Sequence, residues 1–334
     1  MDIKNDGYLH EIAFNTNGDK IVISSSSQKI LFYTKKKPES KVKKRLSTQS
    51  SLSTEMKILN FTDESEWISQ PILNIEIPVL RIKWSNPIYG NIIASCGFDK
   101  KIMLWKEEKE KFKYHTKILE FSDNVEDISF CPKENGLKLA AVTLNGMLKI
   151  FEPSSYIDLL NWDCIYYKDI NNLGCTCLCW NPSSFDPQSL IIGCKINKNN
   201  IDESKCNLLQ ILTFNEYKKQ FNIHKLEGCH CDNITDVEWA TQFGRNYHLI
   251  ASTSLDMKLV VWEVNLIIEK KMRYFDETKI KYIPVFIYHH NKPLWRCSFN
   301  KNGQFLSCID DNGKVILFQK NGRSKFQMVK ICEN

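Results

Sequence analysis

One pattern recurs six times along the 334 residues of the chain. Each copy has an alternating strand that ends in an aromatic residue, a turn, a strand rich in small residues, a second turn and a third apolar strand. The aromatic residues that end the first strands are Phe14, Trp84, Phe130, Trp180, Trp239 and Phe299. From Trp84 onward they lie 46, 50, 59 and 60 residues apart, which indicates a repeat of roughly 40–45 residues with loop insertions.

The repeats predict an all-β chain. Alternation with a period of two places half of the side chains of a strand on each face of its sheet. One small sheet cannot bury both faces, whereas sheets stacked radially bury both and keep their exposed edges short. We therefore predict a single domain over residues 1–334, a six-bladed β-propeller with four-stranded blades. A β-sandwich of similar hairpins is the alternative, and six sequential copies of one motif favour the propeller.

Three segments depart from the repeat pattern. Residues 34–65 form a Lys-rich and Ser-rich insertion, whose low hydrophobicity and clustered positive charge predict a disordered loop. A nuclear-localisation signal or a phosphate-binding patch is the functional alternative to a solvated loop there. Residues 195–205 are a shorter polar loop insertion. Residues 265–278 mix apolar and charged side chains and are expected to contain a helical turn.

The charge balance is mildly basic, with 45 Lys and Arg residues, 39 Asp and Glu residues and a net charge of +6. Much of the excess lies in residues 35–45, so we expect no sequence-specific nucleic-acid binding by the domain as a whole. No run approaches about 18 apolar residues, and residues 1–7 contain no apolar signal-peptide core, so we expect neither membrane insertion nor secretion. The 13 cysteines are then expected to be reduced, and most of them to be buried in strands.

One short cluster has residue types that bind metals. Cys229, His230 and Cys231 lie together, and Cys206 or His224 are candidates for further ligands. Structural zinc sites use two spaced pairs of ligands, and the chain has no two cysteines separated by two residues. We therefore expect no metal site.

The chain also lacks the motifs of common enzymes, including those of serine hydrolases, phosphate-binding loops and dinucleotide-binding folds. We expect no catalytic residue, no cofactor and no enzyme activity. Asp99, Asp256 and Asp311 each precede the third strand of a repeat, where a carboxylate can accept backbone N–H bonds. The adjacent His289 and His290 precede the sixth repeat. We interpret all five residues as structural turn residues.

Five strings within the repeats are informative: NPIYGNIIASC (86–96), PKENGLKLA (132–140), CWNPSS (179–184), FGRNYHLIA (243–251) and LWR (294–296). The second, third and fourth resemble one known family, the Seh-type WD-repeat nucleoporins. The first and last resemble both that family and its close homologue, the vesicle-coat protein Sec-thirteen. The resemblance covers every repeat but not residues 34–65. The chain departs from WD repeats in general because no Trp is followed by Asp; Lys106 follows Trp105, and Glu263 follows Trp262.

The resemblance implies both a fold and a function. Seh-type proteins form an open six-bladed propeller, which a helical scaffold nucleoporin completes by donating a blade. They belong with other nucleoporins to the Y-shaped scaffold complex of the nuclear pore, and a related assembly takes part in nutrient signalling. The implied location is the nuclear pore and nuclear envelope with a cytoplasmic pool, and the implied role is support of protein and mRNA transport. The alternatives are a Sec-thirteen-like role in the COPII coat, or a propeller adaptor that reads a peptide motif.

The sequence itself supports an open ring. No seventh repeat exists, and residues 324–331 can supply the outer strand of the sixth blade. We therefore expect a partner to bind where the first and sixth blades face each other, because unpaired strands and apolar faces seek a partner strand. Not all candidates can face this gap, since some must pack on the neighbouring blade. The candidates are Ile12, Phe14, Ile21, Ile23, Phe299 and Ile316.

Overall fold

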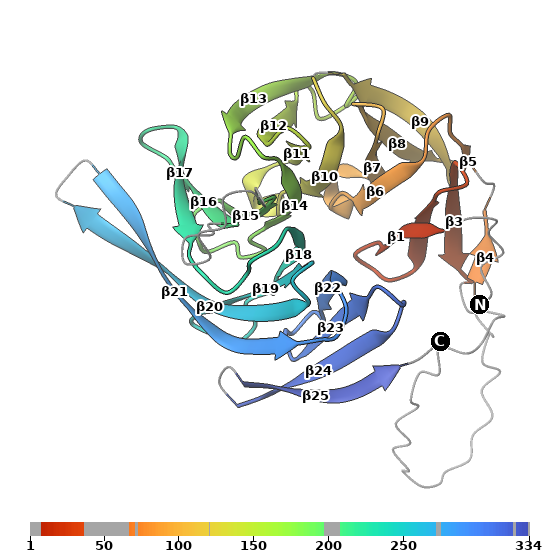
Figure 1. Cartoon of the computed structure of the whole chain (residues 1–334). Coiled ribbons are helices and arrows are strands. Elements are labelled where there is room, and N and C mark those ends of the chain that lie inside the picture. Colours follow the sequence, from red (N-terminus) through yellow and green to blue (C-terminus); the bar gives the residue numbers. More distant parts are fainter. Residues whose placement is uncertain are drawn as a thin grey trace, which may run out of the picture.

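The computed structural model describes residues 8–36, 67–70, 73–119, 121–196, 208–271, 275–322 and 325–332. Its strands form six antiparallel sheets arranged in a ring, and each sheet is one blade (Figure 1). This confirms the prediction of a six-bladed β-propeller. The strands of each blade follow one another in sequence order from the centre of the ring outward, except that the last two short strands of the first blade both pair with its third strand.

The first three blades cover the N-terminal half of the chain. Blade 1 consists of β1 (Leu9–Phe14), β2 (Lys20–Ser25), β3 (Lys29–Lys35), β4 (Trp67–Ser69) and β5 (Leu73–Asn74). Blade 2 consists of β6 (Val79–Trp84), β7 (Ile92–Gly97), β8 (Ile102–Glu108) and β9 (Lys111–Ile118). Blade 3 consists of β10 (Val125–Phe130), β11 (Leu139–Thr143), β12 (Met147–Pro153) and β13 (Trp162–Asp169). Two short 3-10 helices, η2 (Pro87–Tyr89) and η3 (Lys133–Asn135), follow β6 and β10.

The last three blades complete the ring. Blade 4 consists of β14 (Cys175–Trp180), β15 (Ser189–Cys194), β16 (Leu209–Asn215) and β17 (Gln220–Leu226). Blade 5 consists of β18 (Ile234–Trp239), β19 (His248–Ser254), β20 (Lys258–Lys271) and β21 (Phe275–His289). Blade 6 consists of β22 (Leu294–Phe299), β23 (Phe305–Asp310), β24 (Val315–Asn321) and β25 (Lys325–Cys332). As the sequence predicts, the C-terminal segment supplies the outer strand of blade 6.

The core lies between the blades. From blade 1 to blade 6, a cluster of buried apolar side chains fills the interface between each two successive blades. Between blades 3 and 4, for example, Val142 and Ile150 pack with Leu178 and Leu190. Burial of each such side chain stabilises the fold by roughly 1.5–3 kcal/mol, so the stacking of neighbours holds the blades together.

Two of the aromatic residues that end the inner strands form hydrogen bonds across these gaps. Trp84 Nε1 donates a hydrogen bond to the carbonyl oxygen of Ala13 in the preceding blade (3.0 Å). Trp180 Nε1 donates in the same way to the carbonyl oxygen of Ser129 (3.1 Å). Each ring therefore fills space between two blades while its N–H group finds a partner.

A β-bulge interrupts every inner strand at the same place. The pairing register with the second strand shifts by one residue near the start of β1, β6, β10, β14, β18 and β22. A bulge leaves one residue unpaired and changes the direction of its side chain. The unpaired residues are His10, Leu80, Glu126, Thr176, Thr235 and Trp295.

The predicted insertions lie largely outside the described residues. Of the first insertion, residues 37–65 lie outside the described residues, and of the second, residues 197–205 do. Thr34 and Lys35 are the last two residues of β3, and Lys35 pairs with Trp67 at the start of β4. The ends of the first insertion are therefore neighbours in one antiparallel strand pair.

The expected helical turn within residues 265–278 is wrong. In the described residues of this segment β20 and β21 continue as a paired ribbon, in which Leu266 faces Ile280 and Asn265 faces Lys281. Leu266, Ile280 and Tyr282 pack against the core between blades 4 and 5. The ribbon extends beyond the ring alongside blade 4 (Figure 1). Packing on a neighbouring blade, which the local sequence does not reveal, therefore favours the extended conformation.

Candidate functional site

The face of blade 1 that points away from blade 2 is uncovered. Ile12 is 48% exposed and Phe14 is 53% exposed. Residues at the position of Ile12 in the other inner strands pack on the preceding blade and are at most 5% exposed. These residues are Ile82, Ile128, Leu178, Val237 and Cys297. Ile12 has the same place in its blade but no preceding blade to cover it.

Ile21 and Ile23 lie on the same uncovered face. They pair with Phe14 and Ile12 in the register of β1 and β2, so all four side chains share one side of the sheet. Both are buried by side chains of their own blade, in a small cluster with Leu31. Four of the six predicted partner-binding residues therefore come together on one face of blade 1.

Blade 6 has a matching uncovered face. Phe305 is 36% exposed and Ile309 is 37% exposed, and the half-buried Val315 and Leu317 lie on the same side of the sheet. At three of the equivalent positions in blade 5 the side chains of Leu249, Leu259 and Val261 are completely buried against blade 6. We call the gap between these two uncovered faces of blades 1 and 6 the seam.

The other two predicted residues lie elsewhere. Phe299 and Ile316 pack in the cluster between blades 5 and 6, and Ile316 is completely buried there. Ile316 pairs with Cys308, whereas the next residue on each side points to the seam. Sequence reasoning identified the right blade but missed Phe305, Ile309, Val315 and Leu317. Comparison of Phe305, Val315 and Leu317 with their apolar counterparts in blade 5 is the signal that could have found these three.

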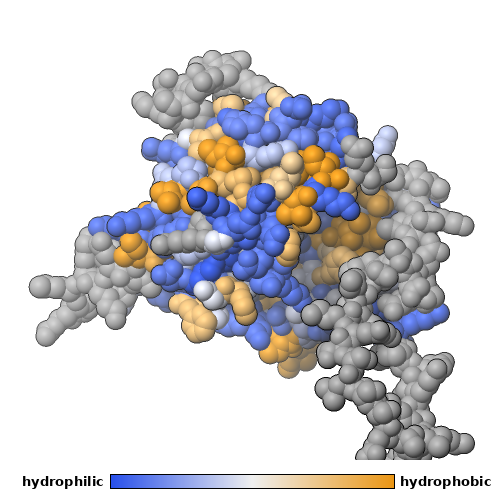
Figure 2. Space-filling model, turned by 90° about the horizontal axis from the view of Figure 1, so that it is seen from below, coloured by the Kyte–Doolittle hydropathy of each residue, from blue (hydrophilic) through white to orange (hydrophobic). Residues whose placement is uncertain are grey.

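Few contacts bridge the seam compared with the other gaps. Inner strands of successive blades pack side by side from β1 to β22, but β22 and β1, both fully described, do not pack in this way. Lys301 Nζ reaches across from the β22–β23 turn and donates a hydrogen bond to the carbonyl oxygen of Thr16 (3.2 Å). Figure 2 looks at the molecule from the lower side of Figure 1, where β24 and β25 lie, and hydrophobic surface is visible in a recess at the right of that view.

Carboxylates join the inner strands of three other pairs of blades. Glu11 Oε2 accepts a hydrogen bond from the backbone N–H of Ile82 (2.7 Å). Asp127 Oδ2 accepts from the N–H of Leu178 (2.9 Å), and Asp236 Oδ2 accepts from the N–H of Cys297 (3.0 Å). Burial raises the pKa of Asp127, and it raises the pKa of Asp236 to about 7. These acids connect successive blades, and their hydrogen bonds to backbone amides give them a structural role.

A chain of hydrogen bonds crosses blade 5 and includes His230, the central residue of the cluster with metal-binding residue types. Trp262 Nε1 donates to Ser252 Oγ (2.9 Å), and Ser252 Oγ lies 2.8 Å from His230 Nε2. His230 Nδ1 lies 3.1 Å from Asp256 Oδ2, which also accepts from the N–H of Cys231. Both ring nitrogens of His230 are thus engaged. No group of three or more metal-ligating side chains lies within the described residues, and Cys206 is outside them.

Two further turn predictions can be compared with the structure. Asp256 accepts the N–H of Lys258, as predicted for a turn residue. Burial raises the pKa of Asp256, but the hydrogen bond and the charge of His230 outweigh this effect and lower the pKa to about 2. In blade 6 the turn residue is Asp310, which accepts the N–H of Lys314 (2.8 Å) and contacts His290 Nε2 (3.1 Å). The assignment to Asp311 was wrong by one residue, and the structural role of His290 is confirmed.

Two cysteines on β14 lie in the core, Cys175 in the cluster between blades 3 and 4 and Cys177 in the cluster between blades 4 and 5. Cys175 and Cys177 are completely buried, and burial raises the pKa of Cys177 well above its ordinary value. A thiol that holds its proton is a poor nucleophile, so these residues are core side chains. Within the described part of the chain, no helix has the length and apolar character needed to cross a membrane.

The six repeated sheets and the apolar clusters between them define a six-bladed β-propeller. In agreement with this class, residues 281–319 match the family model described as WD domain, G-beta repeat.

The chain is also similar to several known proteins over most of its length. The chain is 26% identical over 309 residues to Nucleoporin seh1 of Schizosaccharomyces pombe, covering 84% of this chain and 88% of that protein. It is 23% identical over 339 residues to Nucleoporin SEH1-B of Xenopus laevis, covering 97% and 85%. It is 26% identical over 254 residues to human Nucleoporin SEH1, covering 73% and 69%. These similarities confirm the resemblance to Seh-type nucleoporins.

Proposed function

We propose that this protein is a scaffold nucleoporin that binds a helical scaffold nucleoporin through the seam between blades 1 and 6. The observation that carries the proposal is the exposure of Ile12, at a position where the five counterparts in the ring are buried. The names of the relatives support the assignment to nucleoporins. The proposed role is non-enzymatic, and the proposed domain is the whole of residues 1–334.

The seam has the properties of a surface that receives a β-sheet. Apolar side chains line both walls, with Ile12 and Phe14 on one side and Phe305 and Ile309 on the other. A sheet inserted between these walls would bury both at once, as each blade does for its neighbours. Proteins commonly complete an exposed sheet by adding a strand from a partner. We therefore propose that the helical partner supplies strands that form a further blade.

The proposed cellular setting follows from the same relatives. We place the protein with other nucleoporins in the Y-shaped complex of the nuclear pore, at the nuclear envelope, with a cytoplasmic pool. Its role there would be structural, as a part of the pore scaffold that supports protein and mRNA transport. A shared place in a nutrient-signalling complex is part of the same proposal, because the seam would accept a donated blade in either assembly.

Replacement of the two exposed seam residues tests the proposal. The Ile12→Ala/Phe14→Ala variant and the wild-type chain are each co-expressed with the helical nucleoporin of the same cell, and the affinity of the purified proteins is measured. Each buried side chain contributes roughly 1.5–3 kcal/mol, so binding should weaken by about two orders of magnitude or more. The matched control is Ile157→Ala/Phe185→Ala, which removes the same side-chain types from exposed positions far from the seam.

Circular dichroism checks that both variants are folded. Equal affinity of the folded seam variant and the wild-type chain would contradict the proposal. A wild-type chain that binds the helical protein of the COPII coat and not a nucleoporin would replace the pore function by the coat function, with the seam retained as the binding site.

A further inference from the structure

Within the described strands, two pairs of cysteines face each other across neighbouring strands. Cys175 of β14 is paired with Cys194 of β15, and Cys297 of β22 is paired with Cys308 of β23. All four thiols are reduced in the structure. Residues directly opposite each other in antiparallel strands have Cα atoms roughly 4.5–5.5 Å apart, and a disulfide spans roughly 4.4–6.8 Å. The backbone of both pairs therefore allows a disulfide.

The two pairs are equally buried but differ in their place along the strands. Cys175 and Cys194 pack in the cluster between blades 3 and 4, and Cys297 and Cys308 pack in the cluster between blades 5 and 6. Cys175 is the first residue of β14 and Cys194 is the last residue of β15, and a β-bulge separates this pair from the rest of its ladder. Cys297 and Cys308 lie inside their strands. Since strand ends open more readily than strand centres, the pair in blade 4 is the more accessible one.

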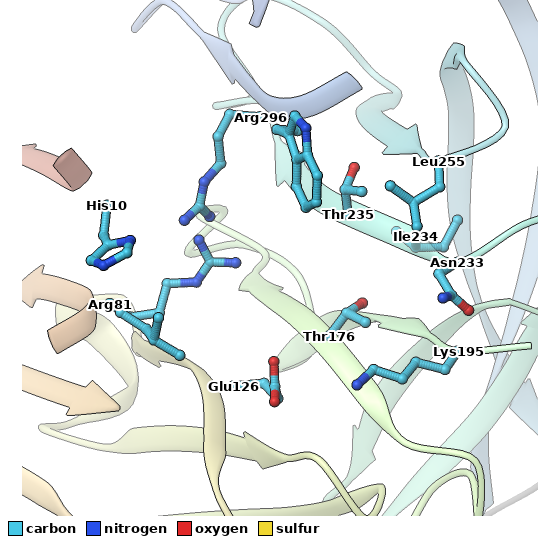
Figure 3. A pocket seen from close by; sticks show the side chains of 12 residues that line it. His10, Arg81, Glu126, Thr176, Lys195, Asn233, Ile234, Thr235, Leu255 and Arg296 are labelled. Atoms are coloured by element: carbon cyan, nitrogen blue, oxygen red, sulfur yellow. The ribbon is translucent and has the colours of Figure 1, made fainter. Parts of the chain in front are cut away.

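A cavity borders the strand ends that hold the pair in blade 4. Thr176 and Lys195, the chain neighbours of Cys175 and Cys194, both line a cavity of about 310 Å³, and Figure 3 shows their side chains at its wall. A water molecule needs only roughly 10–15 Å³ of such space, so a molecule as small as hydrogen peroxide fits there. A brief opening of the strand ends therefore exposes the thiols to a small oxidant.

The two thiols of this pair are chemically unequal. Hydrogen bonding with Cys175 lowers the pKa of the Cys194 thiol, although burial by itself would raise that pKa. The same contact raises the pKa of Cys175, so Cys175 keeps its proton while Cys194 loses its own more readily. In the other pair, burial raises the pKa of both Cys297 and Cys308. Because the thiolate is the nucleophile, Cys194 is the sulfur that reacts first with an oxidant.

We propose that Cys175 and Cys194 form a reversible disulfide when the protein meets a hydroperoxide, which makes this pair an oxidation site in blade 4. The site is separate from the seam, since it lies between blades 3 and 4. The link joins the first two strands of the blade at their ends. It therefore adds a redox-dependent constraint to the propeller that the proposed scaffold function does not require.

The proposed oxidation has two steps. The Cys194 thiolate attacks one oxygen of hydrogen peroxide, so that an S–O bond forms, the O–O bond breaks and the other oxygen leaves as water after protonation. The sulfur of Cys175 then attacks the sulfur of Cys194, the S–S bond forms, and the S–O bond breaks to release a second water with the proton of Cys175. The two thiols lose two electrons in total, and the peroxide takes them up. A small dithiol restores both thiols by thiol–disulfide exchange.

Peptide mapping of the full-length chain tests this site. The reduced protein is treated with hydrogen peroxide, remaining thiols are alkylated, and a non-reduced digest with chymotrypsin, which cleaves at Phe185 between the two cysteines, is analysed by mass spectrometry. The link between Cys175 and Cys194 should exceed the link between Cys297 and Cys308 by about tenfold or more, since each unit by which a thiol pKa falls raises the thiolate fraction about tenfold. Dithiothreitol should remove the link.

Three variants assign the roles of the thiols. Cys175→Ala should leave Cys194 as a sulfenic acid, which dimedone labels, and Cys194→Ala should abolish the link without labelling of Cys175. Cys308→Ala is the matched control, because it removes a buried thiol of the other pair and should leave the link unchanged. Circular dichroism checks that each variant is folded. The oxidised wild-type chain should melt a few degrees higher than the reduced chain, because the link closes a loop of the unfolded chain.

Several results would overturn the proposal. One is absence of the link at a peroxide concentration that oxidises the exposed Cys231. Others are equal yields of the two links, or a link that forms only after urea has unfolded the chain, because the native contact would then play no part. Dimedone labelling of Cys175 in the Cys194→Ala variant would overturn the assignment of Cys194 as the nucleophile. The mapping of the wild-type chain decides the matter even if a variant fails to fold.

Discussion

At the scale of single residues, Ser252 carries the hydrogen-bond chain of blade 5. Its hydroxyl is bonded both to Trp262 and to His230, and all three side chains are buried. Loss of a partner that leaves a buried polar group unsatisfied costs roughly 1–3 kcal/mol. Ser252→Ala removes the partner of two buried groups, the indole N–H of Trp262 and the ring of His230. It should therefore lower the free energy of unfolding by more than the cost of one unsatisfied group.

Blade 2 provides the matched control for this variant. Trp105 Nε1 donates to Ser95 Oγ (2.8 Å) at the equivalent place, with no histidine beyond it. Ser95→Ala should leave only the indole N–H unsatisfied and cost less, as measured by urea unfolding of both variants. Equal losses in the two blades would show that the His230 end of the chain contributes nothing to stability.

Glu238 makes the stability of the protein depend on pH. Burial raises its pKa from 4.5 to about 8, and the neighbouring charge of Asp236 adds to the rise. An acid whose pKa is higher in the folded state holds its proton more tightly there, so the folded state is favoured at low pH. The contribution is fully present below pH 4.5, and the free energy of unfolding falls as pH rises toward about 8.

The Glu238→Gln variant checks this behaviour. Chemical unfolding at a series of pH values between 4.5 and 8 should give a flatter dependence for the variant than for the wild-type chain. Some slope should remain, because the pKa of Asp236 is also raised, to about 7. Parallel curves for the two proteins would mean that Glu238 ionises in the folded state as it does in the unfolded state.

At the scale of elements, the connection between β3 and β4 can be shortened. Lys35 and Trp67 are paired residues of one antiparallel ladder, so a two-residue turn can join the strands. Replacement of residues 36–66 by Asn-Gly should leave the melting temperature unchanged or slightly higher, since each doubling of a flexible loop costs only about 0.6 kcal/mol. A drop of the melting temperature by more than a few degrees would show that the replaced segment stabilises the propeller.

The elements differ in how far the sequence predicts them. Alternation and turn residues predict the inner three strands of each blade, because those strands have a repeated environment. The extension of β20 and β21 was not predicted, since Leu266 and Ile280 owe their conformation to contact with the core between blades 4 and 5. Asp310 was missed for a more local reason: two aspartates are adjacent, and composition does not tell which of them meets the N–H of Lys314.

At the scale of the whole molecule, the repeat count predicted the ring and the position of its seam. It did not predict which faces line the seam. A period of two divides the side chains of a strand between two faces, but it does not show which face points to the seam. Ile316 was therefore predicted to line the seam together with Ile12, although it packs between blades 5 and 6. Only the three-dimensional arrangement shows that Val315 and Leu317, on either side of it, are the uncovered residues.

The order of the blades around the ring also affects how the chain can fold. Each core cluster between blades joins sheets that are consecutive in the sequence, and the seam separates the first blade from the last. A ring closed by pairing its ends must bring together segments about 300 residues apart, and such non-local contacts slow folding. Here no such step is required. During synthesis, each blade can dock on the one that has just left the ribosome, and the face of blade 1 that points to the seam stays uncovered.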